Sequence, residues 1–180
     1  MAMTDSEINQ YMIAALAEAK KAAAIGEVPI GAVVVHDQQI IGRGYNLRET
    51  TQDATQHAEI LAIQAACRQL GTWRLEDCSL FVTLEPCPMC AGTMINARIA
   101  TCYFGATDPK AGVAGTFYNL LEDTRFNHQV AVVPGIQAIA SAALLQDFSV
   151  RFGQNEKRPN RLVKRIEIRY NGFCRKALRQ

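Results

Sequence analysis

Helix-like and strand-like patterns alternate along most of this chain, and this alternation restricts its fold more than any other feature. Thr4 and Glu7 form a capping box ahead of apolar residues at helical spacing, and short β-branched segments follow. Chains with such alternation bury a sheet between layers of helices. We therefore expect an α/β fold with three layers, α/β/α, in which a mixed sheet of about five strands has helices on both faces.

The expected elements end at ordinary stop and turn signals, such as Gly26, Gly71 and the Asp37-Gln38 hairpin turn. The expected helices begin after Thr4 and otherwise cover residues 58–70, 88–96, 117–122 and 136–148, while the expected strands cover residues 30–35, 39–45, 80–84, 102–105 and 130–133. The polar segment 48–56 is expected to be a loop.

The length of 180 residues, 49% of them hydrophobic, is sufficient for one domain. We expect that domain to cover residues 1–152, with a basic extension over 153–180. Residues 151–180 carry ten Lys or Arg and two Glu, a net charge of +8, whereas the first 150 residues carry −6. This asymmetry suggests a polyanionic partner such as nucleic acid, although a solvated tail explains it equally well.

The sequence shows no membrane or export signal. No apolar run approaches the ~18 residues that a membrane span needs. The first seven residues lack the basic region of a signal peptide and the apolar stretch that follows it. We therefore expect a cytoplasmic protein with no membrane partner, in which six cysteines are thiols or metal ligands rather than disulfides.

A cysteine pair and a histidine form a candidate metal centre. Cys87 and Cys90 stand three residues apart at the start of an expected helix, which places both sulfurs on one face and favours thiolates. His57 supplies a third ligand of a type that zinc prefers. A structural zinc site closes with a fourth protein ligand, whereas a catalytic site leaves that position to water. Three ligands therefore predict a catalytic zinc site, with one Zn²⁺ per subunit.

Glu59 is a candidate proton carrier at the same site. Residues two apart on a helix point about 200° apart, so His57 and Glu59 can share a site only at the N-terminal end of a helix. The helix expected over residues 58–70 begins at this point. Glu59 can then take a proton from the metal-bound water and pass it to the substrate.

Other interpretations of these residues stay open at this stage. Cys87 and Cys90 could be a redox pair, although no thioredoxin-like flank accompanies them. A fourth cysteine could close a structural zinc site in an RNA-binding module without chemistry. The candidates for that fourth ligand are Cys67, Cys78 and Cys102. Otherwise these cysteines and Cys174 are expected to be small apolar residues of the core.

The order and spacing of the two motifs are typical of zinc deaminases. Over residues 7–152 the chain resembles the bacterial tRNA-specific adenosine deaminases, which have the cytidine deaminase-like fold. The motifs that carry this resemblance are Glu27-Val28-Pro29-Ile30-Gly31-Ala32-Val33-Val34, His57-Ala58-Glu59-Ile60, Thr83-Leu84-Glu85-Pro86-Cys87-Pro88-Met89-Cys90-Ala91-Gly92, the stretch from Phe104-Gly105-Ala106 through Asp108 to Lys110-Ala111-Gly112, and Phe126-Asn127-His128. After Phe152 the tail is longer than the core fold needs.

The resemblance implies a role for each matching residue. It implies zinc on His57, Cys87 and Cys90, and proton transfer by Glu59. It further implies base or anticodon contacts for four residues, namely Asn46, Asp108, Lys110 and Asn127. From their residue types alone, Asn46 would be a turn asparagine and the other three ordinary surface residues. Asp108 could accept a hydrogen bond from a ribose 2′-hydroxyl.

The same resemblance implies a function and partners. The expected reaction is hydrolytic deamination of adenosine to inosine at the wobble position of a tRNA, with an arginine tRNA as the expected substrate. The expected partners are the tRNA anticodon stem-loop and a second copy of the chain in a homodimer. The alternative is a zinc-dependent deaminase of a free purine base or nucleoside such as guanine, against which the basic tail and the segment 104–112 argue.

Overall fold

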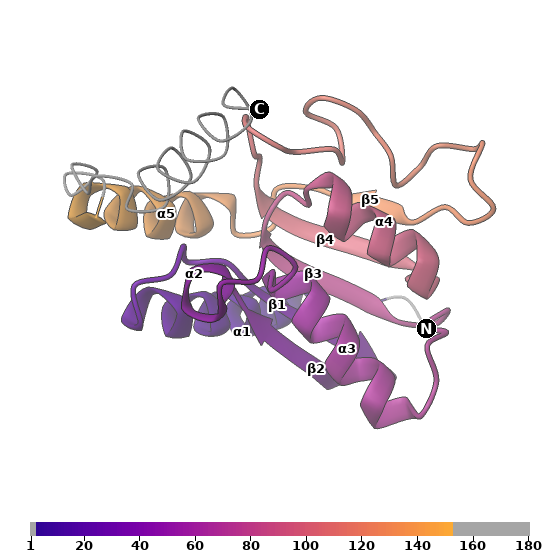
Figure 1. Cartoon of the computed structure of the whole chain (residues 1–180). Helices are drawn as coiled ribbons and strands as arrows, with labels where there is room; N and C mark the ends of the chain where they lie inside the picture. Colours follow the sequence, from indigo (N-terminus) through magenta and orange to yellow (C-terminus); the bar gives the residue numbers. More distant parts are fainter. Residues whose placement is uncertain (1–2, 153–180) are drawn as a thin grey trace, which may run out of the picture. The chain divides into compact units, whose positions relative to one another are not determined.

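Five strands form one mixed sheet in the order β2-β1-β3-β4-β5, in a computed structural model that describes residues 3–152 (Figure 1). The strands are β1 (Gly31–His36), β2 (Gln39–Tyr45), β3 (Ser79–Leu84), β4 (Thr101–Ala106) and β5 (Ala131–Val133). β1 is antiparallel to β2 and β3, whereas β3, β4 and β5 are mutually parallel. The expected mixed sheet of about five strands is confirmed.

Helices cover both faces of this sheet. The helices are α1 (Asp5–Ala24), α2 (Arg48–Thr51), α3 (Ala58–Leu70), α4 (Pro88–Ala97) and α5 (Ala138–Phe152); α1 packs on one face, and α3 and α4 pack on the other. Because side chains alternate along a strand, β1 and β3 present Val33 and Phe81 to α1, and Val34 and other side chains to α3 and α4. Figure 1 shows α3 in front of the sheet and α1 behind it. The expected three-layer α/β/α arrangement is therefore confirmed.

The compact unit that contains this sheet extends to Phe148, and the packing described here is that of residues 3–148. The basic extension expected over residues 153–180 lies outside the described residues, as does Cys174. The expected boundary after residue 152 stays a prediction. Within the described part of the chain, no helix combines the length and apolarity that crossing a membrane requires.

Local signals in the sequence explain the main elements. The Thr4 side chain accepts a hydrogen bond from the backbone N–H of Glu7, whose carboxylate accepts one from the backbone N–H of Thr4. This is the predicted capping box. Asp37 and Gln38 both adopt positive φ, as a tight hairpin turn between β1 and β2 requires.

Two expectations about local structure are wrong. The segment 117–122 is not helical, because its backbone groups have other partners: Leu120 N–H donates to Val113 O, and Ala114 pairs with Asn119 in an isolated bridge. The expected loop 48–56 instead begins with one helical turn, α2, which ends at Gln52 in the left-handed conformation. The partners of the first segment lie five and seven residues apart, which is wider than the spacing of helical hydrogen bonds.

Two glycines in β2 bring α3 close to the sheet. A Cβ atom at Gly42 would collide with the carbonyl oxygen of Ala62, and one at Gly44 would collide with that of Ala58. Ala58 is the first residue of α3 and directly follows His57. The absence of side chains at these positions therefore fixes the position of the helix terminus that carries His57 and Glu59.

We predict that Gly44→Ala lowers the free energy of unfolding by about 1–3 kcal/mol or more, because the added methyl group must displace the backbone of α3. The measurement is the midpoint of urea unfolding. Gly92→Ala is the control, since a Cβ at Gly92 in α4 meets no other atom within contact distance. That variant should gain about 0.5–1 kcal/mol. Equal stability of Gly44→Ala and the parent would contradict the role of this close approach.

Candidate metal centre and active site

Three potential metal ligands meet at the N-termini of two helices. His57 Nδ1 lies 3.6 Å from Cys87 Sγ and 3.5 Å from Cys90 Sγ, and the two sulfurs are 3.6 Å apart. His57 is the N-cap of α3 and Cys87 the N-cap of α4, with Pro88 at the first helical position. The structure therefore brings together ligands that lie up to 33 residues apart in sequence.

This triangle has the dimensions of one face of a tetrahedral metal site. With metal–sulfur bonds of about 2.3 Å and metal–nitrogen bonds of about 2.0 Å, tetrahedral angles separate two sulfurs by about 3.8 Å and a sulfur from a nitrogen by about 3.5 Å. The three observed distances agree with these values within a few tenths of an ångström. The donor set and its geometry both fit a metal ion.

The other cysteines take no part in this cluster. Among residues 3–152, the group of His, Cys, Asp or Glu side chains that could hold a metal consists of His57, Cys87 and Cys90. Cys78 and Cys102 are fully buried, as expected of apolar residues of the core, and Cys67 is half-buried. The described residues thus provide no fourth cysteine ligand, which argues against a closed structural site.

The surroundings of the cluster favour thiolate at Cys87. The hydrogen bond from Cys90, assisted by His57, lowers the pKa of Cys87 to about 4. The hydrogen bond to Cys87 in turn raises the pKa of His57. The N-termini of α3 and α4 add partial positive charge at the same place. Thiolate is the form of cysteine that binds a metal ion.

Glu59 lies beside the cluster and is only 4% exposed. It is the second residue of α3. The helix therefore begins between His57 and Glu59, as a site shared by these two residues requires. Burial raises the pKa of Glu59, and the negative charge of Cys87 raises it further, whereas His57 and Cys90 lower it. A carboxyl group with a raised pKa beside a metal site is suited to accepting and returning a proton.

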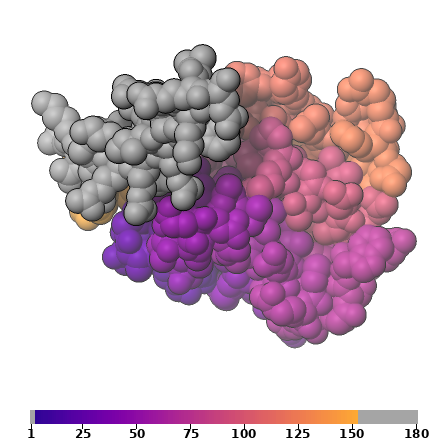
Figure 2. All heavy atoms as spheres, viewed as in Figure 1, coloured from indigo at the N-terminus to yellow at the C-terminus, as the bar shows by residue number. Residues whose placement is uncertain are grey.

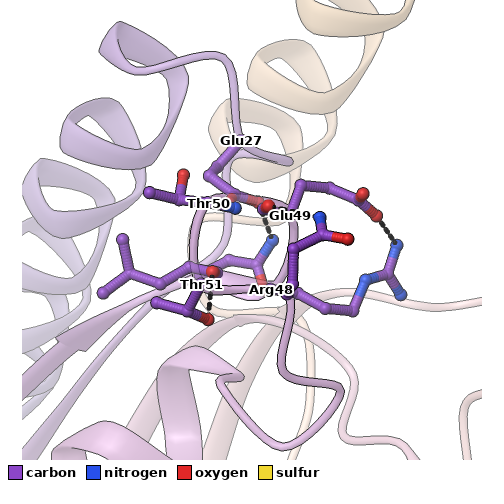
Figure 3. Close-up of polar contacts among 8 residues, drawn as sticks. Glu27, Arg48, Glu49, Thr50 and Thr51 are labelled. Carbon is purple, nitrogen blue, oxygen red and sulfur yellow. Dashed lines mark hydrogen bonds and ion pairs between the residues drawn. The ribbon is translucent and has the colours of Figure 1, made fainter.

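Asn46 is buried and its amide is held by Glu27. Asn46 Nδ2 donates to Glu27 Oε2 at 3.0 Å, and the backbone N–H of Thr50 donates to Glu27 Oε1 at 2.5 Å. Figure 3 shows Glu27 next to Thr50 in the turn of α2, where Arg48 pairs with Glu49. Asn46 is therefore more than a turn asparagine: a buried carboxylate fixes its amide and leaves Oδ1 as an acceptor.

Asp108 and Lys110 lie in the segment that follows β4. The Lys110 side chain is exposed and that of Asp108 half-buried. Asp108 Oδ1 accepts a hydrogen bond from the backbone N–H of Lys110, and the backbone N–H of Asp108 donates to Glu85 Oε2. Since Glu85 stands two residues before Cys87, the structure links this segment to the cluster.

Asn127 is not brought to the cluster. Its side-chain oxygen accepts a hydrogen bond from Arg98, the C-cap of α4, which also donates to the carbonyl oxygen of Ile95. Cys87 caps the opposite end of the same ten-residue helix, about 15 Å away. Asn127 therefore lies near the far end of α4 and is exposed there.

The sequence pattern missed two buried glutamates. Glu27 is 1% exposed and Glu85 is 2% exposed, yet neither was expected to have a role of its own. Their signal was indirect, since both stand within the motifs that carried the family resemblance. A glutamate in an apolar segment can be predicted to be buried only when its hydrogen-bonding partners are known. The partners of Glu27 and Glu85 lie 19 to 31 residues further along the chain.

Comparisons with known proteins agree with the geometry. Residues 6–150 match the family model of the MafB19-like deaminases. A tRNA-specific adenosine deaminase of Bacillus subtilis (strain 168) is 53% identical over 146 residues, which cover 81% of this chain and 89% of the relative. The fold of the chain also resembles a structure from studies of A-to-I editing by tRNA:A34 deaminases at the wobble position of transfer RNA, with a TM-score of 0.73 and 42% identity over 76% of this chain and 99% of that one.

A second solved structure bears on the alternative substrate. A guanine deaminase of Bacillus subtilis matches with a TM-score of 0.52 and 39% identity, but the match covers 54% of this chain and 63% of that chain. The similarity to the tRNA deaminases is greater in identity and in coverage.

We predict that Cys90→Ser reduces bound metal from about one ion per chain to less than about one tenth, because a hydroxyl is a poor replacement for a thiolate ligand. Metal is measured by mass spectrometry of the purified protein after exposure to zinc and removal of the excess. Cys67→Ser is the matched control, since Cys67 contributes no ligand to the cluster. Full metal content in the Cys90 variant would contradict the assignment.

Proposed function

This chain belongs to the MafB19-like deaminase family. From its similarity to the tRNA-specific adenosine deaminases we propose that it converts adenosine to inosine at the wobble position of the anticodon of a tRNA. It is an enzyme, and its reaction is a hydrolytic deamination. The observation that carries this conclusion is the His57–Cys87–Cys90 triangle with the buried carboxyl group of Glu59 beside it.

The metal at this triangle is proposed to be zinc, one ion per subunit, held by His57, Cys87 and Cys90. Two thiolates and one imidazole are the ligand types that zinc prefers, and the ligand separations fit its tetrahedral bond lengths. When bound, zinc supplies a Lewis acid that lowers the pKa of a water molecule to ~7.

Glu59 is proposed to carry the proton of the reaction. Its carboxylate accepts a proton from the attacking water and delivers it to N1 of adenine, while the water oxygen adds to C6. The same carboxylate then takes the remaining proton from the oxygen now on C6 and gives it to the amino group. The C6–N6 bond breaks, and ammonia departs to leave a C6 carbonyl with the first proton on N1. Burial and the nearby thiolate raise the pKa of Glu59, which suits a group that must both accept and donate.

The base is proposed to be held by Asn46, and the RNA by Asp108, Lys110 and Asn127. The Asn46 amide is fixed by Glu27 and offers Oδ1 as an acceptor. Asp108 and Lys110 lie in the segment joined to Glu85, where Lys110 can meet phosphates and Asp108 can accept from a ribose 2′-hydroxyl. Asn127, near the far end of α4, is suited to a nucleotide distant from the extruded base.

The proposed partner is the anticodon stem-loop, with an arginine tRNA as the substrate. We propose further that the enzyme acts as a homodimer in the cytoplasm, in line with the family resemblance and with its tRNA substrate. The net charge of +8 over residues 151–180 supports added affinity for the RNA backbone.

We predict that Glu59→Gln lowers kcat for deamination by about 10²–10⁴-fold, because the amide cannot carry the proton. Inosine is read by sequencing after incubation with tRNA, and metal content is measured in parallel. Glu76→Gln, at an exposed glutamate that pairs with Arg74, is the control and should leave kcat unchanged. Substantial turnover in the Glu59 variant would refute the role of Glu59.

A second experiment compares substrates. The purified enzyme is incubated with an arginine tRNA that carries adenosine at the wobble position, with free adenosine, and with guanine. We expect inosine in the tRNA and no turnover of the small molecules. Deamination of guanine without reaction of the tRNA would overturn the RNA assignment and leave the metal chemistry intact.

A further inference from the structure

Glu85 is a buried carboxylate whose hydrogen bonds all come from one loop. It directly follows β3 and is 2% exposed. Its Oε1 accepts from the backbone N–H groups of Ala114 and Thr116, each at 3.0 Å. Its Oε2 accepts from the backbone N–H of Asp108 at 3.0 Å and from the Thr116 hydroxyl at 2.5 Å. One side chain thus collects four donors from residues 108–116.

The loop is also packed directly against this carboxylate. A Cβ atom at Gly112 would collide with the carboxyl group of Glu85. The backbone N–H of Val113 donates to the carbonyl oxygen of Pro86, and the backbone N–H of Glu85 donates to that of Ala106. Residues 85 and 86 therefore contact both the loop and the end of β4, immediately before Cys87, the N-cap of α4.

Part of this loop lies at the surface, whereas its middle is buried. Lys110 and Thr116 are exposed, and Val113 and Ala114 belong to the hydrophobic core. In Figure 2 the segment between β4 and β5, coloured salmon to light orange, forms part of the outer surface. Apolar packing therefore holds the middle of the loop, and hydrogen bonds to Glu85 hold Asp108 and Thr116 on either side of it.

We propose that Glu85 is a positioning residue for RNA recognition. Its buried carboxylate fixes the loop 108–116, and so fixes the positions of Asp108 and Lys110 relative to the metal ligand Cys87. Through Glu85 and Pro86, a short stretch of backbone joins the reacting centre to a surface that binds RNA. This proposal rests on the tRNA deaminase function proposed above. It assigns Glu85 no contact with substrate or metal.

The isosteric variant Glu85→Gln separates this role from burial alone. Glutamine keeps the shape but replaces one acceptor oxygen with an NH₂ group. In one orientation that NH₂ faces the N–H groups of Ala114 and Thr116, so both bonds are lost. In the other orientation the Thr116 hydroxyl can rotate to accept, but the N–H of Asp108 is left without an acceptor. Either way a buried donor is left unpaired.

The test measures kcat and KM for tRNA deamination, metal content, and amide hydrogen exchange of residues 107–119 in the parent and in Glu85→Gln. We expect KM for the tRNA to rise about 10-fold or more, as for loss of a hydrogen bond to a charged group. We expect kcat to change less than about 3-fold, metal content to be retained, and exchange in the loop to accelerate.

Glu122→Gln is the matched control. Glu122 is an exposed glutamate of the same segment, and its carboxylate accepts from Val132 N–H and Asn119 Nδ2 rather than from the loop. Its variant should keep the parental KM. Thr116→Val removes one hydrogen-bond donor to Glu85 at an exposed position. This variant should raise KM in the same direction but by less. It replaces Glu85→Gln in the test if Glu85→Gln does not fold.

Several outcomes would overturn the proposal. If Glu85→Gln has a KM within twofold of that of the parent, the loop does not depend on Glu85. If Glu85→Gln does not fold, the same result in Thr116→Val leads to the same conclusion. Loss of metal together with kcat would make Glu85 a support of the cluster instead. If the parent enzyme deaminates guanine and not tRNA, the proposed function fails. Hydrogen exchange then still tests, independently of RNA, whether Glu85 orders the loop.

Discussion

The meeting of two helix N-termini at one point is the constraint on which the rest of this structure depends. His57 caps α3 and Cys87 caps α4, and their ligand atoms must lie within about 4 Å of each other to share a metal ion. This requires α3 to lie against β2, which Gly44 permits, and α4 to begin where β3 ends. The helix dipoles and the thiolates then stabilise one another.

Three buried glutamates, Glu27, Glu59 and Glu85, lie in the motifs that carry the family resemblance, and each has a different environment. Glu27 accepts from Asn46 and Thr50, Glu85 accepts four hydrogen bonds from residues 108–116, and Glu59 lies beside the cluster. Burying a carboxylate is costly unless hydrogen bonds satisfy it. Glu27 and Glu85 meet this condition and order loops; hydrogen bonds to Glu85 offset the effect of burial and lower its pKa. At Glu59 the effect of burial prevails and raises the pKa, as proton transfer requires.

The success of sequence reasoning differed between elements for physical reasons. α3 was predicted with its bounds, because its apolar spacing and the following Gly71 are local signals. The segment 117–122 has a helix-like pattern, but hydrogen bonds from Leu120 to Val113 and the bridge between Ala114 and Asn119 hold it in another conformation. Likewise, the turn of α2 is joined through Thr50 to Glu27, a partner 23 residues away. Neither set of partners has the i to i+4 spacing of a helix, so the apolar pattern of either segment does not reveal them.

The sequence by itself predicted the fold class and the three residues that form the potential metal-binding cluster. Alternating helix and strand patterns predict an α/β fold, and Cys87 and Cys90 share a helix face because residues three apart do so in any helix. Only the tertiary structure decided how far His57 is from them, that Asn127 lies near the opposite end of α4, and that Glu27 and Glu85 have partners. The physical reason is the sequence separation of the interacting residues. Helix and strand patterns arise from neighbours along the chain, whereas distances across the sheet depend on packing between segments that are far apart in the sequence.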